Sequence, residues 1–112
     1  MLNIDAKNNI TLTRGDTLTL SLTLTTRNGE AYTPEAGDVI RFAISKGFCG
    51  DAFYDLKYSQ DIPTDTLSLT VPASETKKLE CGEYNYDVEI THNDGFVDTV
   101  ISARLKITGE VK

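Results

Sequence analysis

The stretch Leu79–Val88, LECGEYNYDV, decides the predicted fold of this chain. Its glycine permits a sharp turn, and Tyr84, Tyr86 and Val88 then alternate with polar residues, which is the two-residue period of a half-buried strand. A tyrosine just inside a strand, a few residues after a turn, is the pattern of a tyrosine corner, in which the hydroxyl bonds to upstream backbone. We therefore predict that Tyr84 is buried, that its hydroxyl bonds to backbone near Leu79, and that the fold is a Greek-key β-sandwich.

A second strong strand signal covers Asp16 to Thr26. Leu18, Leu20, Leu22 and Leu24 alternate there with threonines and a serine. Leucine favours helices, but a period of two cannot line one face of a helix, so the period predicts a strand. The leucine row is expected to face a core and the hydroxyl row to face water.

The same alternation, together with turn residues, predicts the remaining elements. A short edge strand is expected at 10–12, and further strands at 39–45, 53–60, 66–71, 82–92 and 96–107. Turns are expected at 14–16, 27–30 and 93–95, an irregular connection at 31–38, a mobile loop at 46–52 and a break at 61–65. A helical turn at 74–79, with Ser74 as its N-cap, is expected to cross between the sheets.

The long final strand carries a predicted irregularity. Its inward row is expected at Thr99, Ile101, Ala103, Leu105 and Ile107. The Val100-Ile101 doublet interrupts the alternation and predicts a β-bulge or a position buried on both faces.

These elements predict the fold class. About seven antiparallel strands with a short helical turn and no long helix are typical of an all-β, immunoglobulin-like Greek-key sandwich. The 112 residues are expected to form a single domain, 1–112, large enough for a core without disulfides or metals. The Cys–Trp–Cys arrangement of antibody domains is absent, because the chain has no tryptophan.

The chain carries a formal net charge of −6. Nucleic-acid backbones and anionic membranes attract basic patches, and Lys77-Lys78 is the only adjacent basic pair, so neither is expected as a main partner. No apolar run approaches the roughly 20 residues of a membrane-spanning helix, and no secretory signal is visible. We expect a chain used without export, whose acidity serves solubility.

Residues that could carry chemistry are few and dispersed. Cys49 and Cys81 lie far apart, which favours free thiols over a disulfide framework, and the absence of CxxC spacing disfavours a zinc site. His92 lies at a strand end with no serine or cysteine marked as its partner, so a structural or solvated role is expected. We predict no catalytic, cofactor-binding or metal-binding residues and no enzyme activity.

Weaker alternatives stay open. Loop carboxylates of a sandwich can bind calcium, and the candidates are Asp16, Asp38 and Asp94, although EF-hand spacing is absent. Residues 14–16 spell Arg-Gly-Asp, an integrin-binding tripeptide that is also ordinary turn sequence. Exposed aromatic rings can stack on sugars or partners, but packing is the default for Tyr32, Tyr54 and Tyr58.

Several stretches together carry a family resemblance: ITLTRGDT at 10–17, GDVIRFAI at 37–44, LTVPASETKKL at 69–79, GEYNYDV at 82–88, the Asp94-Gly95 hairpin and LKITGEV at 105–111. They resemble small proteins of tailed phages and prophages of gut Firmicutes, similar to the immunoglobulin-like N-terminal domain of baseplate upper proteins. The resemblance implies a virion protein assembled in the bacterial host cytoplasm, which docks onto other phage structural proteins of a tail or baseplate. It transfers no catalytic motif.

Two functions follow as expectations. The leading one is a non-enzymatic structural or interaction module of a phage or prophage virion. The alternative is a free-standing carbohydrate- or ligand-binding β-sandwich of a bacterial host. We also expect self-association or docking through an unprotected strand edge with few charges at Thr17–Thr25 and Ile10–Thr13, unless the N-terminal segment covers that edge.

Overall fold

The computed structural model describes residues 2–25, 28–47 and 50–109. Strands dominate this part of the chain: β1 (Leu2–Ile4), β2 (Ile10–Thr13), β3 (Leu18–Ser21), β4 (Val39–Lys46), β5 (Asp55–Ile62), β6 (Ser68–Val71), β7 (Gly82–Thr91) and β8 (Val97–Thr108). The single helix within these described ranges, α1 (Ala73–Thr76), is one turn long.

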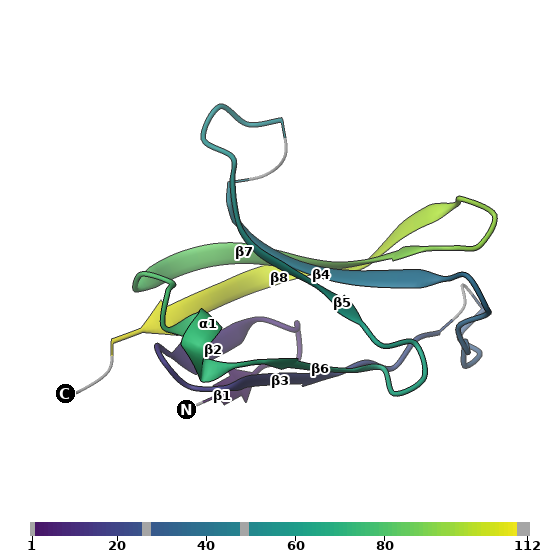
Figure 1. The fold of residues 1–112 in the computed structure, drawn as a ribbon, viewed down its shortest axis with the longest axis horizontal. Helices are drawn as coiled ribbons and strands as arrows, with labels where there is room; N and C mark the ends of the chain where they lie inside the picture. Colours follow the sequence, from purple (N-terminus) through teal and green to yellow (C-terminus); the bar gives the residue numbers. More distant parts are fainter. Residues whose placement is uncertain (1, 26–27, 48–49, 110–112) are drawn as a thin grey trace.

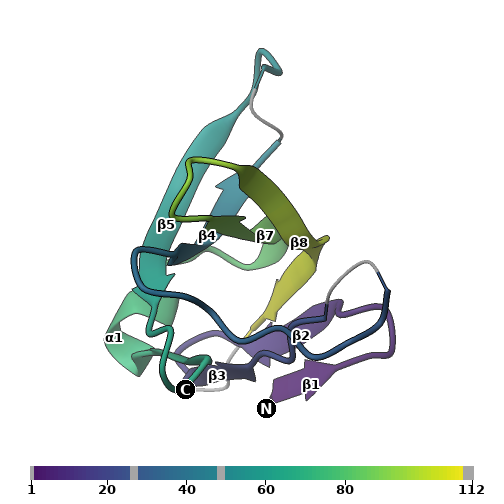
Figure 2. The same cartoon turned by 90° about the vertical axis from the view of Figure 1, so that its right-hand side faces the viewer.

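Two sheets contain these strands. The larger sheet has the order β1-β2-β8-β7-β4-β5, and the smaller one pairs β3 with β6 (Figure 1). The larger sheet is mixed, because β2 runs parallel to β8 while the other neighbours are antiparallel. It also curves, so that β1 and β2 lie at the level of the smaller sheet (Figure 2).

Apolar side chains of both sheets form one core cluster. Leu18 and Leu69 enter it from the smaller sheet, and Phe42, Tyr86 and Leu105 enter it from the larger one. Each of these side chains is at most 2% exposed. Full burial of a side chain of this size stabilises the fold by about 1.5–3 kcal/mol, so this cluster holds the two sheets together.

The predicted leucine strand is confirmed in its burial pattern and is shorter than expected. All four leucines are buried and the described hydroxyl residues between them are exposed. However, β3 ends at Ser21, because β6 provides a partner only for Leu18–Ser21. Thr26 and Arg27 lie outside the described residues.

The N-terminal elements correct the prediction of an edge strand at 10–12. β2 lies inside the larger sheet, between β1 and β8. The edge is formed by β1, which lacks a clear alternation and was not predicted from the sequence.

The second half of the chain shows two further differences. β5 begins at Asp55 and continues through the predicted break to Ile62, which is 2% exposed and pairs with Ile40. The helical turn is confirmed, but Pro72 occupies its N-cap position and Ser74 lies inside it, so the predicted Ser74 cap is wrong.

The bulge predicted at the Val100-Ile101 doublet is confirmed. Val88 pairs with Ile101 and Glu89 pairs with Thr99, so Val100 is the additional residue. The bulge changes the alternation, and Asp98 rather than the predicted Thr99 lies opposite the buried Ile90.

Candidate functional site

The tyrosine corner predicted at Tyr84 is confirmed. The Tyr84 side chain is 3% exposed, and its hydroxyl donates to the Glu80 carbonyl at 2.6 Å. Burial raises the pKa of this hydroxyl, which therefore stays a neutral donor. The bond fixes the backbone just before β7 begins.

The Arg-Gly-Asp turn supports the same corner. Arg14 Nε donates to the Leu79 carbonyl at 3.0 Å, and the Thr76 hydroxyl donates to the Asp16 carbonyl at 2.7 Å. Gly15 supplies the positive φ of 86° that the turn requires. Arg14, Gly15 and Asp16 therefore have a structural role, because they join the β2–β3 turn to the segment that follows α1 and to α1 itself.

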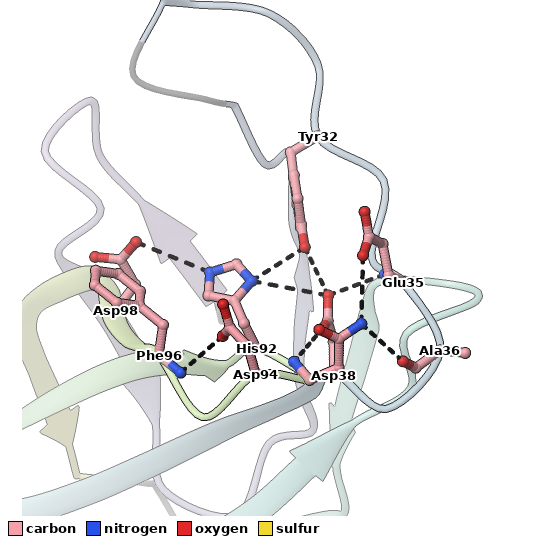
Figure 3. Close-up of polar contacts among 9 residues, drawn as sticks. Tyr32, Glu35, Ala36, Asp38, His92, Asp94, Phe96 and Asp98 are labelled. Atoms are coloured by element: carbon pink, nitrogen blue, oxygen red, sulfur yellow. Dashed lines mark hydrogen bonds and ion pairs between the residues drawn. The ribbon is translucent and has the colours of Figure 1, made fainter.

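A polar network lies at the opposite end of the sheets, around the side chain of Asp38 (Figure 3). This carboxylate is almost fully buried and accepts from the Tyr32 hydroxyl at 2.6 Å and from the Glu35 and Asn93 backbone N–H groups, each at 2.9 Å. The Tyr32 hydrogen bond is the main cause of the lowered pKa of Asp38. The same bond raises the pKa of Tyr32 to about 12. The network ties the 31–38 connection to the β7–β8 hairpin.

His92 lies between this network and the β8 strand (Figure 3). Its Nδ1 is 3.1 Å from the Tyr32 hydroxyl oxygen and 3.9 Å from Asp38 Oδ2, and its Nε2 is 4.0 Å from Asp98 Oδ2. The His92 ring also packs near Phe96, with ring centroids 6.0 Å apart. No serine, threonine or cysteine is among these contacts of the described residues, so they provide no nucleophile for His92 to activate.

A cleft of about 430 Å³ opens beside His92. One wall is the extended segment Leu22–Thr25, and the other consists of Asp98, Val100 and Ile101 of β8. Tyr32, Ile90 and His92 complete the lining. Pockets of about 300–1,000 Å³ with apolar walls and a few convergent polar groups are the usual form of binding sites.

Open strand edges border this cleft, and we call the cleft with these edges the open flank. β2 pairs only with residues 105–108 of β8. One residue before this paired part of β8, the Arg104 N–H donates to the Asn9 side chain at 3.1 Å. Across the cleft, Leu22 N–H donates to the Leu67 carbonyl on the β6 side. Because successive residues of a strand alternate in hydrogen-bonding direction, the backbone groups of Ser21 and Thr23 point away from β6.

The N-terminal segment does not pair with β3. Instead β1 pairs with β2, and Leu2 packs against the core. The predicted strand edge is therefore correct for the part at 17–25 and wrong for Ile10–Thr13, which β1 and β8 enclose.

The three candidate calcium ligands do not meet at one site. Asp16 lies beside α1, whereas Asp38 and Asp94 lie at the opposite end of the sheets, where the Asp94 carboxylate accepts from the Phe96 N–H at 3.0 Å (Figure 3). Among the described residues, no group of three or more His, Cys, Asp or Glu side chains could hold a metal ion.

The remaining sequence candidates are placed separately. Tyr58 is half-buried and donates to Gln60, whereas Tyr54 is 40% exposed. Cys81 is a free, exposed thiol, and Cys49 lies outside the described residues. Within the ranges that the structure describes, no helix is both long and apolar enough to cross a membrane.

Sequence reasoning did not identify Asp98 or the cleft. The available signal was the Val100-Ile101 doublet, whose bulge puts Asp98 on the cleft side. A comparison with protein-family models found none that matches this chain, and a search of curated proteins found no match either.

Proposed function

We propose that this chain is a non-enzymatic, immunoglobulin-like interaction module of a phage or prophage virion, as a component of a tail or baseplate. In this proposal the chain assembles in the bacterial host cytoplasm, and its partners are other phage structural proteins and further copies of itself. The virion assignment comes from the sequence resemblance, and the structure contributes support for the interaction role.

The immunoglobulin-like Greek-key topology is supported by the strand order. β2 lies parallel beside the last strand, β3 and β6 form the opposite sheet, and a helical turn crosses from β6 to β7. The hydroxyl of Tyr84 also makes its corner bond four residues upstream.

The open flank is the observation that carries the interaction role. Unpaired strand edges are templates for an added strand, and natural proteins usually protect them with charges or bulges. β5, at one edge of the larger sheet, has such protection in its register shift near Lys57 and in its charged residues. In the open flank, the β8 edge likewise has a bulge at Val100 and the charge of Asp98. Across the cleft, residues 17–25 contain no charged side chain, so theirs is the unprotected edge.

Co-expression with the products of the neighbouring genes tests this function. We expect the chain to co-purify with one of them through size-exclusion chromatography. Val100→Arg, which places a long cation in the cleft, should abolish co-purification, whereas Val39→Arg, at a similarly exposed valine outside the cleft lining, should preserve it. Failure of the unmodified chain to bind any of these products would refute the proposal.

Ligand or carbohydrate binding is the second candidate, favoured by the size of the cleft and by its Tyr32, His92 and Asp98 groups. Screening of the chain on a glycan array tests it. A glycan whose binding is lost in both His92→Ala and Asp98→Asn would support this candidate. Binding unaffected by both substitutions would exclude the cleft as the site.

A further inference from the structure

We infer that the cleft binds a primary ammonium group on an aliphatic stem, supplied by a lysine side chain of a partner protein. This inference rests on the proposed interaction role and names the chemistry that the partner presents. It is carried by the hydrogen-bonding capacities of Tyr32, His92 and Asp98.

The Tyr32 hydroxyl determines which nitrogen of neutral His92 carries the proton. Tyr32 has a single hydroxyl proton, and the 2.6 Å bond to Asp38 uses it. The 3.1 Å contact between the Tyr32 oxygen and His92 Nδ1 therefore needs a proton on Nδ1. This tautomer, assigned from the network, leaves Nε2 of a neutral His92 as an acceptor.

The unprotonated Nε2 faces a second acceptor. Asp98 Oδ2 lies 4.0 Å away, and a carboxylate has only lone pairs to offer. Two acceptors at this separation can share one donor nitrogen that lies to the side of the line joining them, at hydrogen-bond distance from both. An ammonium group, with three N–H donors and a positive charge, satisfies both and compensates the Asp98 charge.

The rest of the cleft suits the stem that carries the ammonium group. Leu22, Leu24, Ile90, Val100 and Ile101 give the walls an apolar surface. Lysine places four methylene groups between its backbone and its charge, and such stems pack along apolar surfaces. The Asp98 side chain is 58% exposed, so a charged group can reach it from solvent.

The bulge at Val100 supports a binding role for Asp98. If β8 paired with β7 without a bulge, Val100 would lie opposite Glu89, and Thr99 would lie opposite Ile90 in place of Asp98. Bulges are frequent next to functional sites, where they redirect a side chain. Net charge −6 and the carboxylate in the cleft both favour a cationic partner.

A titration of the full chain at pH 8, followed by amide NMR shifts, tests the inference. The probes are Nα-acetyl-lysine N-methylamide and the matching norleucine compound, which keeps the aliphatic stem and lacks the ammonium group. We expect the lysine probe to shift amides of 22–25 and 98–101, and to bind at least about tenfold more tightly than the norleucine probe. Equal binding of the two probes would overturn the inference.

Two variants test whether Asp98 causes the preference for the lysine probe. Asp98→Asn should remove the preference for the lysine probe, and Asp94→Asn, a matched change outside the cleft lining, should retain it. An unchanged preference in Asp98→Asn, or an equal loss in both variants, would refute the assignment. Co-purification with a tail protein that Asp98→Asn does not weaken would refute this inference alone, whereas lysine binding without any tail partner would refute the proposed function alone.

Discussion

Removal of the Tyr84 hydroxyl is expected to destabilise the fold by about 1 kcal/mol. Tyr84→Phe retains the buried ring and deletes only the 2.6 Å bond to the Glu80 carbonyl. A hydrogen bond contributes about 0.5–1.5 kcal/mol net, and an acceptor left without a partner in the interior costs about 1–3 kcal/mol. Glu80 is an exposed residue, so water can partly replace the lost donor, which favours the lower part of this range.

Urea unfolding followed by far-UV circular dichroism measures this effect. With a denaturant slope of about 2 kcal/mol per molar, a loss of 1 kcal/mol lowers the midpoint by about 0.5 M. The melting temperature should fall by about 4 °C.

Tyr58→Phe is the matched control. The Tyr58 hydroxyl donates to the side chain of Gln60, which is half-buried and can turn toward water, so we expect a change below about 0.5 kcal/mol. An unchanged midpoint in Tyr84→Phe, or equal effects of the two substitutions, would refute the structural importance of the corner.

Other predictions concern the turns, the buried network and metals. Gly37→Ala should destabilise more than Gly29→Ala: both glycines have positive φ, but a Cβ at Gly37 would lie 3.0 Å from Asn93 Cβ, whereas that at Gly29 meets nothing within 4 Å. Comparison of their thermal midpoints tests this difference. The lowered pKa of folded Asp38 gives stability that is present above the ordinary aspartate value of 3.8 and is lost as pH falls through the folded pKa. As the pH is lowered into the acid range, the free energy of unfolding should therefore fall less steeply in Asp38→Asn than in the unmodified protein. The same acid dependence in both proteins would contradict the role of the network. Near-stoichiometric calcium or zinc should leave the melting temperature unchanged, because no ligand cluster is found among the described residues, and a rise of several degrees would contradict this expectation.

The elements with strong local patterns could be predicted from sequence. The alternation of leucines from Leu18 and the Tyr84 motif each depend on residues close in the chain, and both predicted burial correctly. Whether a strand lies at the edge or in the interior of a sheet depends on its pairing with strands that are distant in the sequence. Nothing near Ile10–Thr13 indicates that β8 lies beside it, so its interior position could not be predicted.

The candidate site was only partly predictable for the same reason. The doublet at Val100 indicated a bulge, but its effect on Asp98 depends on register with Ile90. Asp38 was considered as a calcium ligand, and its actual partners, Tyr32 and Asn93, come from different segments. The Ser74 cap was wrong because Pro72, with φ −61° and ψ 152°, already holds the extended geometry of a cap position.

The pairing of β2 with β8 has a consequence for how the chain folds. This contact joins Ile10 to Leu105, so nearly the whole chain must be present before the larger sheet can close. During synthesis, β2 has only β1 as a neighbour until β8 leaves the ribosome. Folds dominated by such distant pairings acquire their structure slowly, in roughly milliseconds to seconds, since loop closure precedes the stabilising contacts. A nascent chain that exposes its leucine row in that interval is vulnerable to aggregation, so folding yield should depend on expression rate more strongly than the equilibrium stability would suggest.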